Sequence, residues 1–168
     1  TQEQWSLLIQ GLHTLGRIAY DFNMKIVYHY HAGTGVFWEK DIDFLMTNTS
    51  PKLLSLLLDT GHAVFSGIDP VNLINKYGDR ILYVHLKDIR PEVLRRVEME
   101  RLSFMDAVRR GVFTVPGDGA IDFIPIWAGL QKHRYNGWMI VEAEQDPEKA
   151  HPLEYAKKAY DYLHSFIH

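Results

Sequence analysis

Four short apolar runs of this sequence each end in a side chain that binds divalent metal ions. These side chains, each with the run before it, are His29 after Ile26–Tyr28, Asp59 after Leu54–Leu58, His85 after Ile81–Val84, and Glu142 after Trp138–Val141. Buried parallel strands read as continuous Val, Ile and Leu stretches, and α/β folds place their chemistry at the carboxyl ends of such strands. The four side chains therefore predict one metal site gathered from distant parts of the chain, which indicates an enzyme.

The mixture of imidazole and carboxylate ligands favours Mn²⁺, Co²⁺, Fe²⁺ or Zn²⁺ over Mg²⁺ or Ca²⁺, which prefer oxygen ligands alone. Asp59 follows an apolar run, so its charge needs a metal, an ion pair or several hydrogen bonds. The alternative is that Asp59 only caps the next turn. His85 taken alone would be a core histidine, and its strand-end position is what favours a ligand role.

Further polar side chains follow the expected ligands at a spacing of two or three residues. Lys87 and Glu144 each lie two residues after a ligand and so share its face of the strand. Lys87 can act as acid, base or substrate contact, or it can pair with Asp88 or Glu142. Glu144 can contact substrate or move a proton, with a rim salt bridge as the alternative. His62 is expected in a loop over the site, where it contacts substrate or supports a ligand.

Helices and strands alternate along the chain and would bring these side chains together. Helical spacing of apolar residues predicts helices within 5–22, 42–46, 123–130 and 155–166, and strands are expected at 26–31, 54–59, 81–87 and 138–143. Asp69 and Pro70 suit the start of another helix, and Gly78 suits its end. An αβαβαβ…αβα order requires a mostly parallel sheet with right-handed crossovers.

One segment, 88–120, interrupts this alternation after the third visible strand. A long excursion at a strand's carboxyl end often forms a lid or wall of an active site, and the alternative is a surface insertion. Only four strand–helix units are visible, whereas a (β/α)₈ barrel needs about 250 residues. The sheet is therefore either small and open or half of a barrel, and a half-barrel would leave two strand edges that invite dimerisation.

Composition limits the classes of partner. The 168 residues carry a net charge of −3, which argues against nucleic acid or an anionic membrane surface as the main partner. The densest basic stretch, Arg90–Arg110, alternates with acidic residues and is expected to form a solvated helix face. No apolar run reaches the length of a membrane span, and no signal peptide opens the chain. Absence of cysteine excludes thiolate ligands and nucleophiles, and a cytoplasmic location is expected.

Several motifs, in their order and spacing, resemble those of the inosose dehydratases, which belong to the xylose isomerase-like barrels. The motifs are His29–Thr34, Leu58–Ala63, Gly78–Ile81, Val84–Asp88, Gly111–Gly119, Gly137–Trp138 and Val141–Asp146. The resemblance covers nearly the whole chain, from about the fifth strand of such a barrel to its final helix. It implies that residues 1–168 form a single domain, the C-terminal half of a (β/α)₈ TIM barrel with about four β/α units.

The resemblance also implies a lyase acting in the inositol catabolism of the cytoplasm. In that reaction 2-keto-myo-inositol (inosose), a small polyhydroxylated ketone, loses water to give a trihydroxycyclohexane dione through a metal-stabilised enediolate. The metal implied is Mn²⁺ or Co²⁺, with Zn²⁺ or Fe²⁺ as alternatives.

Three of the superfamily's four metal ligands match Asp59, His85 and Glu142 in this chain. The fourth, a glutamate in the isomerases, falls at His29, so simple keto–aldose isomerisation is disfavoured and the dehydratase subgroup is favoured. Either His29 or its same-face neighbour His31 is the fourth ligand. The catalytic acid and base are sought among three residues whose order stays open: His31, Lys87 and Glu144.

Two other functions stay open. One is a metal-dependent sugar isomerase or epimerase on the same barrel. The other is an inactive half-barrel fragment that folds alone or as a homo-oligomer, because residues of a missing N-terminal half would shape the other wall of the pocket.

Overall fold

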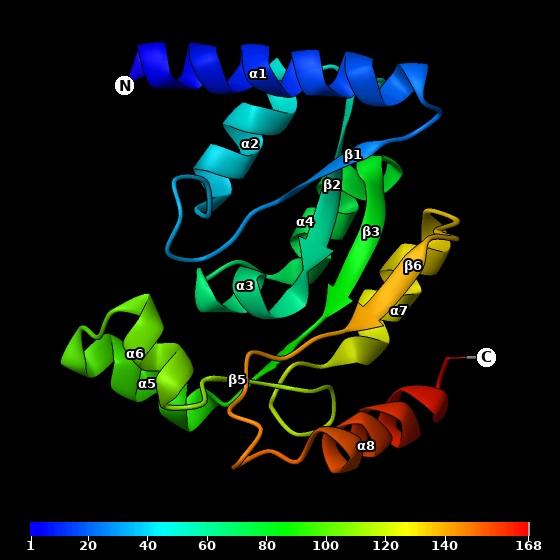
Figure 1. The fold of residues 1–168 in the computed structure, drawn as a ribbon. Helices are drawn as coiled ribbons and strands as arrows, with labels where there is room; N and C mark the ends of the chain where they lie inside the picture. Colours follow the sequence, from blue (N-terminus) through cyan, green and yellow to red (C-terminus); the bar gives the residue numbers. More distant parts are fainter. Residues whose placement is uncertain (168) are drawn as a thin grey trace.

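A four-stranded sheet forms the centre of the computed structural model, which describes residues 1–167 (Figure 1). Its strands are β1 Ile26–His29, β2 Leu54–Asp59, β3 Ile81–Leu86 and β6 Trp138–Val141. They lie in the order β1-β2-β3-β6 and every neighbouring pair is parallel. The predicted α/β class and parallel sheet are therefore confirmed.

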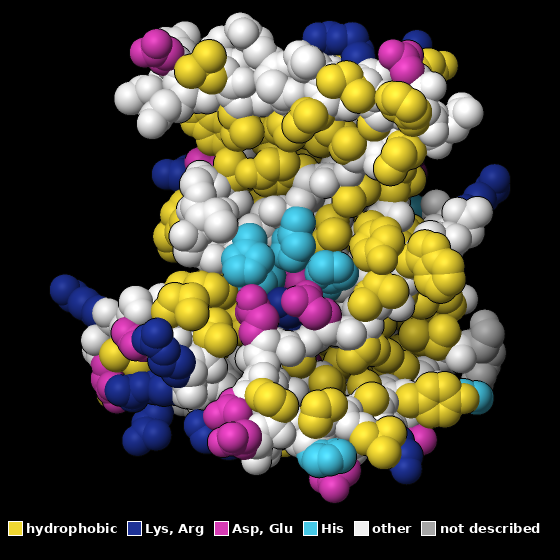
Figure 2. All heavy atoms as spheres, in the orientation of Figure 1, with side chains coloured by type: hydrophobic (Ala, Val, Ile, Leu, Met, Phe, Trp, Pro, Cys, Tyr) yellow, Lys and Arg dark blue, Asp and Glu magenta, His cyan; other side chains and the backbone are white. Residues whose placement is uncertain are grey.

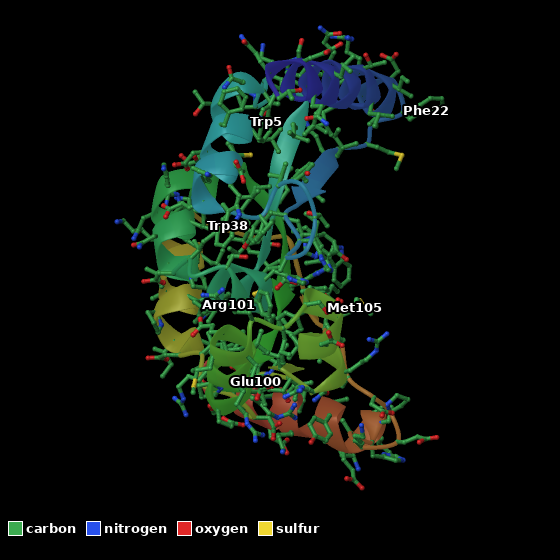
Figure 3. The ribbon with its side chains drawn as sticks, turned by 90° about the vertical axis from the view of Figure 1, so that its left-hand side faces the viewer. Trp5, Phe22, Trp38, Glu100, Arg101 and Met105 are labelled. Atoms are coloured by element: carbon green, nitrogen blue, oxygen red, sulfur yellow. The ribbon has the colours of Figure 1, made fainter. Side chains whose placement is uncertain are left out.

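Helices connect the strands and cover one face of the sheet. They are α1 Gln2–Asp21, α2 Glu39–Asn48, α3 Thr60–Phe65, α4 Pro70–Tyr77 followed by the 3₁₀ turn η1 Gly78–Arg80, α7 Phe123–Lys132 and α8 Pro152–His164. Figure 3 shows α2, α4 and α7 aligned along the sheet, with α1 and α8 at opposite ends of the molecule. The opposite face of the sheet is left open (Figure 1). In residues 1–167 no helix combines the length and the hydropathy needed to cross a membrane.

The core forms between the sheet and these helices. Leu54, Leu56 and Leu58 of β2 are fully buried and pack with apolar side chains of α2, α4 and α7. Because successive side chains of a strand alternate between the two faces, the residues between these leucines, and Asp59 after them, are directed toward the open face. Trp5 of α1 packs against Phe44 of α2, with ring centroids 4.7 Å apart.

Local signals in the sequence set several helix ends as predicted. The Asp69 carboxylate accepts a hydrogen bond from the Val71 N–H at 2.8 Å, Pro70 occupies the first turn of α4, and Gly78 ends the helix. The expected helices near residues 5–22, 42–46, 123–130 and 155–166 are all present.

Three predicted strands are longer than the observed ones. β1 ends at His29 rather than His31, β3 ends at Leu86, and β6 ends at Val141. Beyond His29 the Tyr30 hydroxyl forms hydrogen bonds with the N–H and the carbonyl oxygen of Asp59. A longer β1 would have used these backbone groups for the hydrogen bonds between β1 and β2. Helix α3 was not predicted, because six residues directly after a strand carry no readable helical period.

The segment after β3 forms a small subdomain of its own. It contains β4 Asp88–Ile89, α5 Pro91–Glu100, α6 Phe104–Arg109 and β5 Phe113–Thr114, with β4 and β5 antiparallel. Its core consists of Ile89, Val97, Ala107, Val112 and Phe113. The helical stretch in this segment was expected, whereas the two-residue strands were not, because they are too short to show a pattern.

Candidate metal centre

The four strand ends meet on the open face of the sheet. His29, Asp59, His85 and Glu142 each direct one ligand atom into a group whose members all lie within 4.8 Å of one another. Figure 2 shows the histidine side chains beside the carboxylates at the middle of this face. The structure therefore brings together the four residues that the sequence predicts as metal ligands.

The strand register sets their relative positions. Asp59 lies directly opposite His85, and His85 lies opposite Ile140, two residues before Glu142. An irregularity in β3 contributes, because Leu56 pairs with Ile81 while Leu57 pairs with Tyr83, so that one residue of β3 is skipped. A continuous register would have put Val84, not His85, opposite Asp59.

Asp59 uses its two oxygens differently. Oδ1 accepts a hydrogen bond of 2.8 Å from the His62 N–H and so caps α3. Oδ2 is turned into the cluster, 3.6 Å from His29 Nε2 and 3.4 Å from His85 Nδ1. The two interpretations of Asp59, as a cap and as a ligand, are therefore compatible in one side chain.

Three buried polar atoms of the cluster make no hydrogen bond within residues 1–167. They are Asp59 Oδ2, His85 Nδ1 and Glu142 Oε2, and the last two lie 2.9 Å apart. Lys87 Nζ makes ion-pair contacts with two of them, at 3.2 Å from Glu142 Oε2 and 3.6 Å from Asp59 Oδ2, but none of the three atoms has a hydrogen bond in the described part of the chain. Buried polar atoms are normally hydrogen-bonded, since leaving one without such a bond costs about 1–3 kcal/mol. A divalent cation among the three atoms would satisfy all of them, so the donor set fits a metal.

The geometry at His29 supports the same conclusion. Its Nδ1 lies 2.7 Å from the carbonyl oxygen of Tyr30, which can only accept, so Nδ1 carries the proton. Burial lowers the pKa of His29, which keeps the ring neutral. The lone pair of Nε2 therefore faces the Asp59 carboxylate, an arrangement that a cation between them stabilises.

The electrostatics of the cluster follow from these contacts. The carboxylates of Asp59 and Glu142 raise the pKa of His85 to about 9. Contact with His85 in turn lowers the pKa of Glu142 to about 2. Burial by itself would raise the pKa of Asp59, but His85 and Lys87 outweigh it and lower the value to about 2. Both carboxylates are therefore ionised at neutral pH and attract positive charge.

A second group lies beside the first and contains His31, His62 and Glu144, whose ligand atoms also lie within 4.8 Å of one another. His31 Nε2 is 3.3 Å from Glu144 Oε1. The structure thus groups His29 with the predicted ligands and His31 with Glu144.

His62 lies in the first turn of α3, so its expected place in a loop was wrong: Asp59 starts the helix immediately after the strand. Burial lowers the pKa of His62 to about 3, which keeps it neutral.

Lys87 connects the two groups. Its side chain is fully buried, and Nζ lies 3.2 Å from Glu142, 3.5 Å from Glu144 and 3.1 Å from His62 Nε2. Of the two alternative partners considered for Lys87, Glu142 is therefore present. Asp88 is not, because its carboxylate accepts hydrogen bonds from four backbone N–H groups: those of Ile89, Gly117, Gly119 and Ile121.

Two hydroxyl groups that the sequence analysis did not single out hold the site in place. The buried Tyr30 hydroxyl donates to the Asp59 carbonyl at 2.7 Å and accepts from the Asp59 N–H at 3.1 Å. The Thr60 hydroxyl contacts Lys87 in the same way, with distances of 2.6 Å to the carbonyl and 2.9 Å from the N–H. The only sequence signal for them was a hydroxyl residue adjacent to each strand end.

Aromatic side chains of the subdomain cover one side of the second group. The rings of Phe104 and Phe113 lie 5.9 Å and 5.0 Å from the His62 ring, and Lys87 Nζ lies 5.0 Å from the Phe113 ring centre. Sequence reasoning offered a lid or wall as one interpretation of this segment but did not single out these residues, because apolar side chains in an excursion do not reveal what they face.

Comparisons with known proteins agree with this architecture. Inosose dehydratase of Geobacillus kaustophilus is 55% identical over 168 residues, which are 100% of this chain and 54% of that protein. Inosose dehydratase of Clostridium beijerinckii is 56% identical over 162 residues, covering 96% of this chain and 54% of that protein. The chain thus spans about half the length of these curated relatives.

Solved structures match the fold at low sequence identity. The probable 3-DHS dehydratase AsbF of Bacillus anthracis superposes with a TM-score of 0.77 at 16% identity, over 99% of this chain and 59% of that one. The IOLI protein crystallised with a zinc atom gives a TM-score of 0.69 at 19% identity, over 95% and 56%. A family model described as xylose isomerase-like TIM barrel matches residues 1–166. This chain belongs to the xylose isomerase-like TIM barrel family.

Proposed function

We propose that this chain carries the metal centre of an enzyme that dehydrates 2-keto-myo-inositol (inosose) to a trihydroxycyclohexane dione. The observation that carries the proposal is the convergence of Asp59 Oδ2, His85 Nδ1 and Glu142 Oε2 as buried atoms without hydrogen bonds in the described chain. Relatives at 53–56% identity that bear the name inosose dehydratase support the choice of substrate.

His29, Asp59, His85 and Glu142 are the proposed ligands. Two imidazoles and two carboxylates suit Mn²⁺ or Co²⁺, and they also suit Zn²⁺ or Fe²⁺. The zinc atom bound by the IOLI protein supports a divalent ion on this kind of barrel. The group formed by His31, His62 and Glu144 offers one ligand atom fewer than the first group, so we place the proposed ion in the first group.

A metal bound here would polarise the substrate carbonyl and orient its neighbouring hydroxyl. The remaining steps belong to side chains. A base among His31 and Glu144 removes the proton from the carbon next to the carbonyl. An acid, for which Lys87 is the best placed, gives a proton to the hydroxyl on the carbon β to the carbonyl, and the C–O bond of that hydroxyl breaks so that one water departs. The resulting enol gains a proton on carbon and loses its hydroxyl proton, which gives the dione. The overall change is the loss of one water.

Phe104 and Phe113 are proposed to limit access of water to the side of the site occupied by His62, in keeping with their ring contacts. The subdomain within 88–120 would then act as a wall of the active site. Because the chain spans about half of its relatives, we propose that it is the C-terminal half of their barrel and that the other half completes the pocket.

The test is turnover in a complete enzyme that carries these residues, with product identified by mass spectrometry. We expect loss of one water from inosose, and Lys87→Met should lower kcat by about 10²–10⁴-fold. Lys132→Met on the exposed surface of α7 is the matched control and should leave kcat unchanged. Conversion of ketohexoses without any dehydration of inosose would instead assign the rival function, a sugar isomerase or epimerase.

A further inference from the structure

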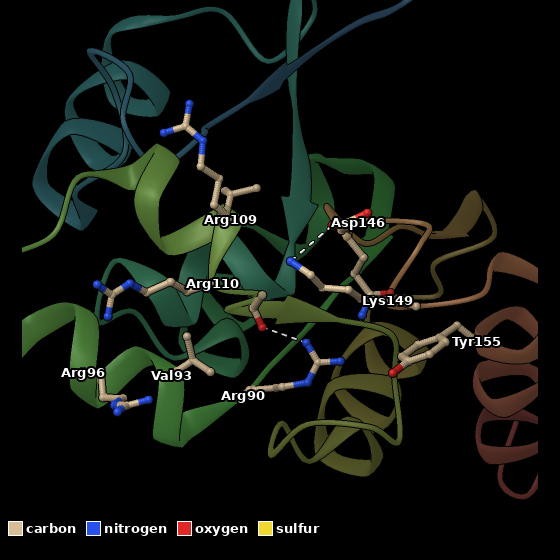
Figure 4. Close-up of a pocket in the computed structure, with 12 residues that line it drawn as sticks. Arg90, Val93, Arg96, Arg109, Arg110, Asp146, Lys149 and Tyr155 are labelled. Carbon is tan, nitrogen blue, oxygen red and sulfur yellow. Dashed lines mark hydrogen bonds and ion pairs between the residues drawn. The ribbon is translucent and has the colours of Figure 1, made fainter.

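A cavity of about 560 Å³ lies outside the metal centre, between the subdomain helices α5 and α6 and the segment that joins β6 to α8 (Figure 4). Its volume lies within the range of small-molecule sites. None of the proposed ligands or catalytic residues lines it. The charged and aromatic lining residues are Arg90, Arg96, Arg109, Arg110, Lys149 and Tyr155, together with Asp146.

The charge of this cavity differs from that of the chain. The lining contains five Lys and Arg side chains but a single acidic one, Asp146, whereas the whole chain carries a net charge of −3. In the sequence the arginines alternate with acidic residues, which predicted a solvated face. In the fold Glu92, Glu98, Glu100 and Asp106 do not line the cavity, although Glu100 pairs with Arg110 and Asp106 pairs with Arg109, so the lining itself is mainly cationic.

Arg90 forms a rigid cationic wall of the cavity. Its guanidinium donates to the carbonyl oxygens of Gly111 at 2.7 Å and Phe113 at 3.2 Å. It also donates to Thr114 Oγ1 at 3.0 Å and to Asp118 Oδ2 at 2.8 Å. These four partners occupy both N–H groups of each terminal nitrogen, so Arg90 forms a fixed wall of the cavity rather than a donor that is free for a ligand.

Among the other cations Arg110 pairs with Glu100 at 2.8 Å, whereas two more are held loosely. Arg109 pairs with Asp106 at 3.3 Å, and Lys149 pairs with Asp146 at 3.2 Å, in both cases with cation side chains more than 70% exposed. Exposed pairs of this kind contribute less than about 1 kcal/mol, so a ligand can take over the cation. Arg96 forms no ion pair among residues 1–167. In Figure 4 the side chain of Lys149 reaches toward the middle of the view, whereas those of Arg109 and Arg110 extend away from Arg90.

We propose that this cavity binds a small molecule that carries phosphoryl groups. The guanidinium of Arg96, which has no ion-pair partner in the described chain, can match two phosphate oxygens at once, and the weakly paired Arg109 and Lys149 add charge that suits an anion of more than one charge. The cavity is bounded by α5, α6 and the β6–α8 segment, and its size fits a metabolite rather than an extended nucleic acid. The proposal is independent of the proposed dehydration, since it uses none of the same residues.

Isothermal titration calorimetry with pyrophosphate at low salt tests the proposal on the whole chain. We expect saturable binding at one site, weakened roughly tenfold or more by Arg96→Glu and by Arg109→Glu. Arg95→Glu is the matched control, because Arg95 is an exposed residue of α5 that does not line the cavity. The affinity of this variant for pyrophosphate should stay within about twofold of that of the unchanged chain.

Three results would overturn the proposal. The first is that binding fails to saturate at millimolar pyrophosphate. The second is that Arg95→Glu weakens pyrophosphate binding as much as the cavity variants do. The third is that duplex DNA binds more tightly than pyrophosphate and is weakened by the same cavity variants. The last result would assign the surface to nucleic acid. Circular dichroism of each variant shows that the fold is retained, and Arg109→Gln, which removes charge without reversing it, should give an intermediate affinity.

Discussion

Asp59 shows how one residue can serve both the fold and the proposed chemistry. Its Oδ1 caps α3, and this bond orients Oδ2 toward His29 and His85. The peptide groups on either side of the carboxylate are in turn held by the Tyr30 hydroxyl. A proposed metal ligand at a buried strand end is therefore held in place by Tyr30, which lies outside the proposed set of ligands.

At this scale we predict that Tyr30→Phe lowers the free energy of unfolding by about 1–3 kcal/mol, because it leaves the buried N–H and C=O of Asp59 without their partner. Urea unfolding followed by circular dichroism measures the change. Tyr28→Phe is the control, since within the described chain the Tyr28 hydroxyl makes no hydrogen bond, and it should change stability by less than about 0.5 kcal/mol. Equal losses for the two variants would contradict the assigned role.

The residue types of the candidate centre could be predicted from the sequence, while their grouping could not. An acidic or histidine side chain after an apolar run is visible in one dimension, which is why His29, Asp59, His85 and Glu142 were found. Whether His29 or His31 joins that group depends on where β1 ends. The sequence does not reveal that point, because the Tyr30 hydroxyl replaces the strand ladder there.

At the scale of elements, the skipped residue in β3 is the feature that the sequence could least reveal. The run Ile81–Leu86 looks like any buried strand, yet the shift between Leu56 and Leu57 puts Asp59 opposite His85. Long helices and buried strands were predictable from their periods and caps. Helix α3 and the β4–β5 pair were not, because elements of two to six residues are specified by tertiary contacts.

Asp118 links the loop before α7 to two other elements and gives a pH-dependent prediction. It accepts hydrogen bonds from Arg90 after β4, from Thr114 of β5 and from Lys158 of α8. Burial acts to raise the pKa of Asp118, but these three donors lower it overall. An acid with a lowered pKa in the fold stabilises the protein above its unfolded pKa of about 4, and this stabilisation is lost as the pH falls.

We therefore expect Asp118→Asn to lower the free energy of unfolding by about 1–2 kcal/mol at pH 7 and by clearly less at pH 3. Urea unfolding at the two pH values measures the difference. Asp161→Asn, an exposed residue of α8, is the control and should show no such dependence. A loss that is the same at both pH values would mean that the charge of Asp118 does not hold the loop.

For the whole molecule, the open edges of the sheet are the main consequence of the fold. Among the described strands β1 and β6 each pair on one side only, and Trp138 of β6 is 73% exposed. Free edges and exposed apolar side chains favour association. In the relatives, which are about twice as long, we propose that the second half of the barrel covers these edges.

The 168-residue chain on its own should consequently self-associate. Size-exclusion chromatography with light scattering should give a mass above 19.5 kDa that rises with concentration. Trp138→Lys should shift the equilibrium toward the monomer. Leu153→Lys is the control and should not shift it, because Leu153 is also an exposed apolar residue but lies on α8, away from the strand edges. A constant mass of 19.5 kDa at all concentrations would contradict the proposed edge contacts.

If the four strand ends form one divalent metal site, a cobalt titration of the chain should detect it. Because all four residues come from this chain, we predict one Co²⁺ per chain, with visible absorption bands that report nitrogen and oxygen ligands. Asp59→Asn and His85→Ala should each weaken binding by roughly a hundredfold or more, and Asp161→Asn should leave it unchanged. Full stoichiometry and unaltered affinity in the Asp59 and His85 variants would show that the four strand ends do not form this site.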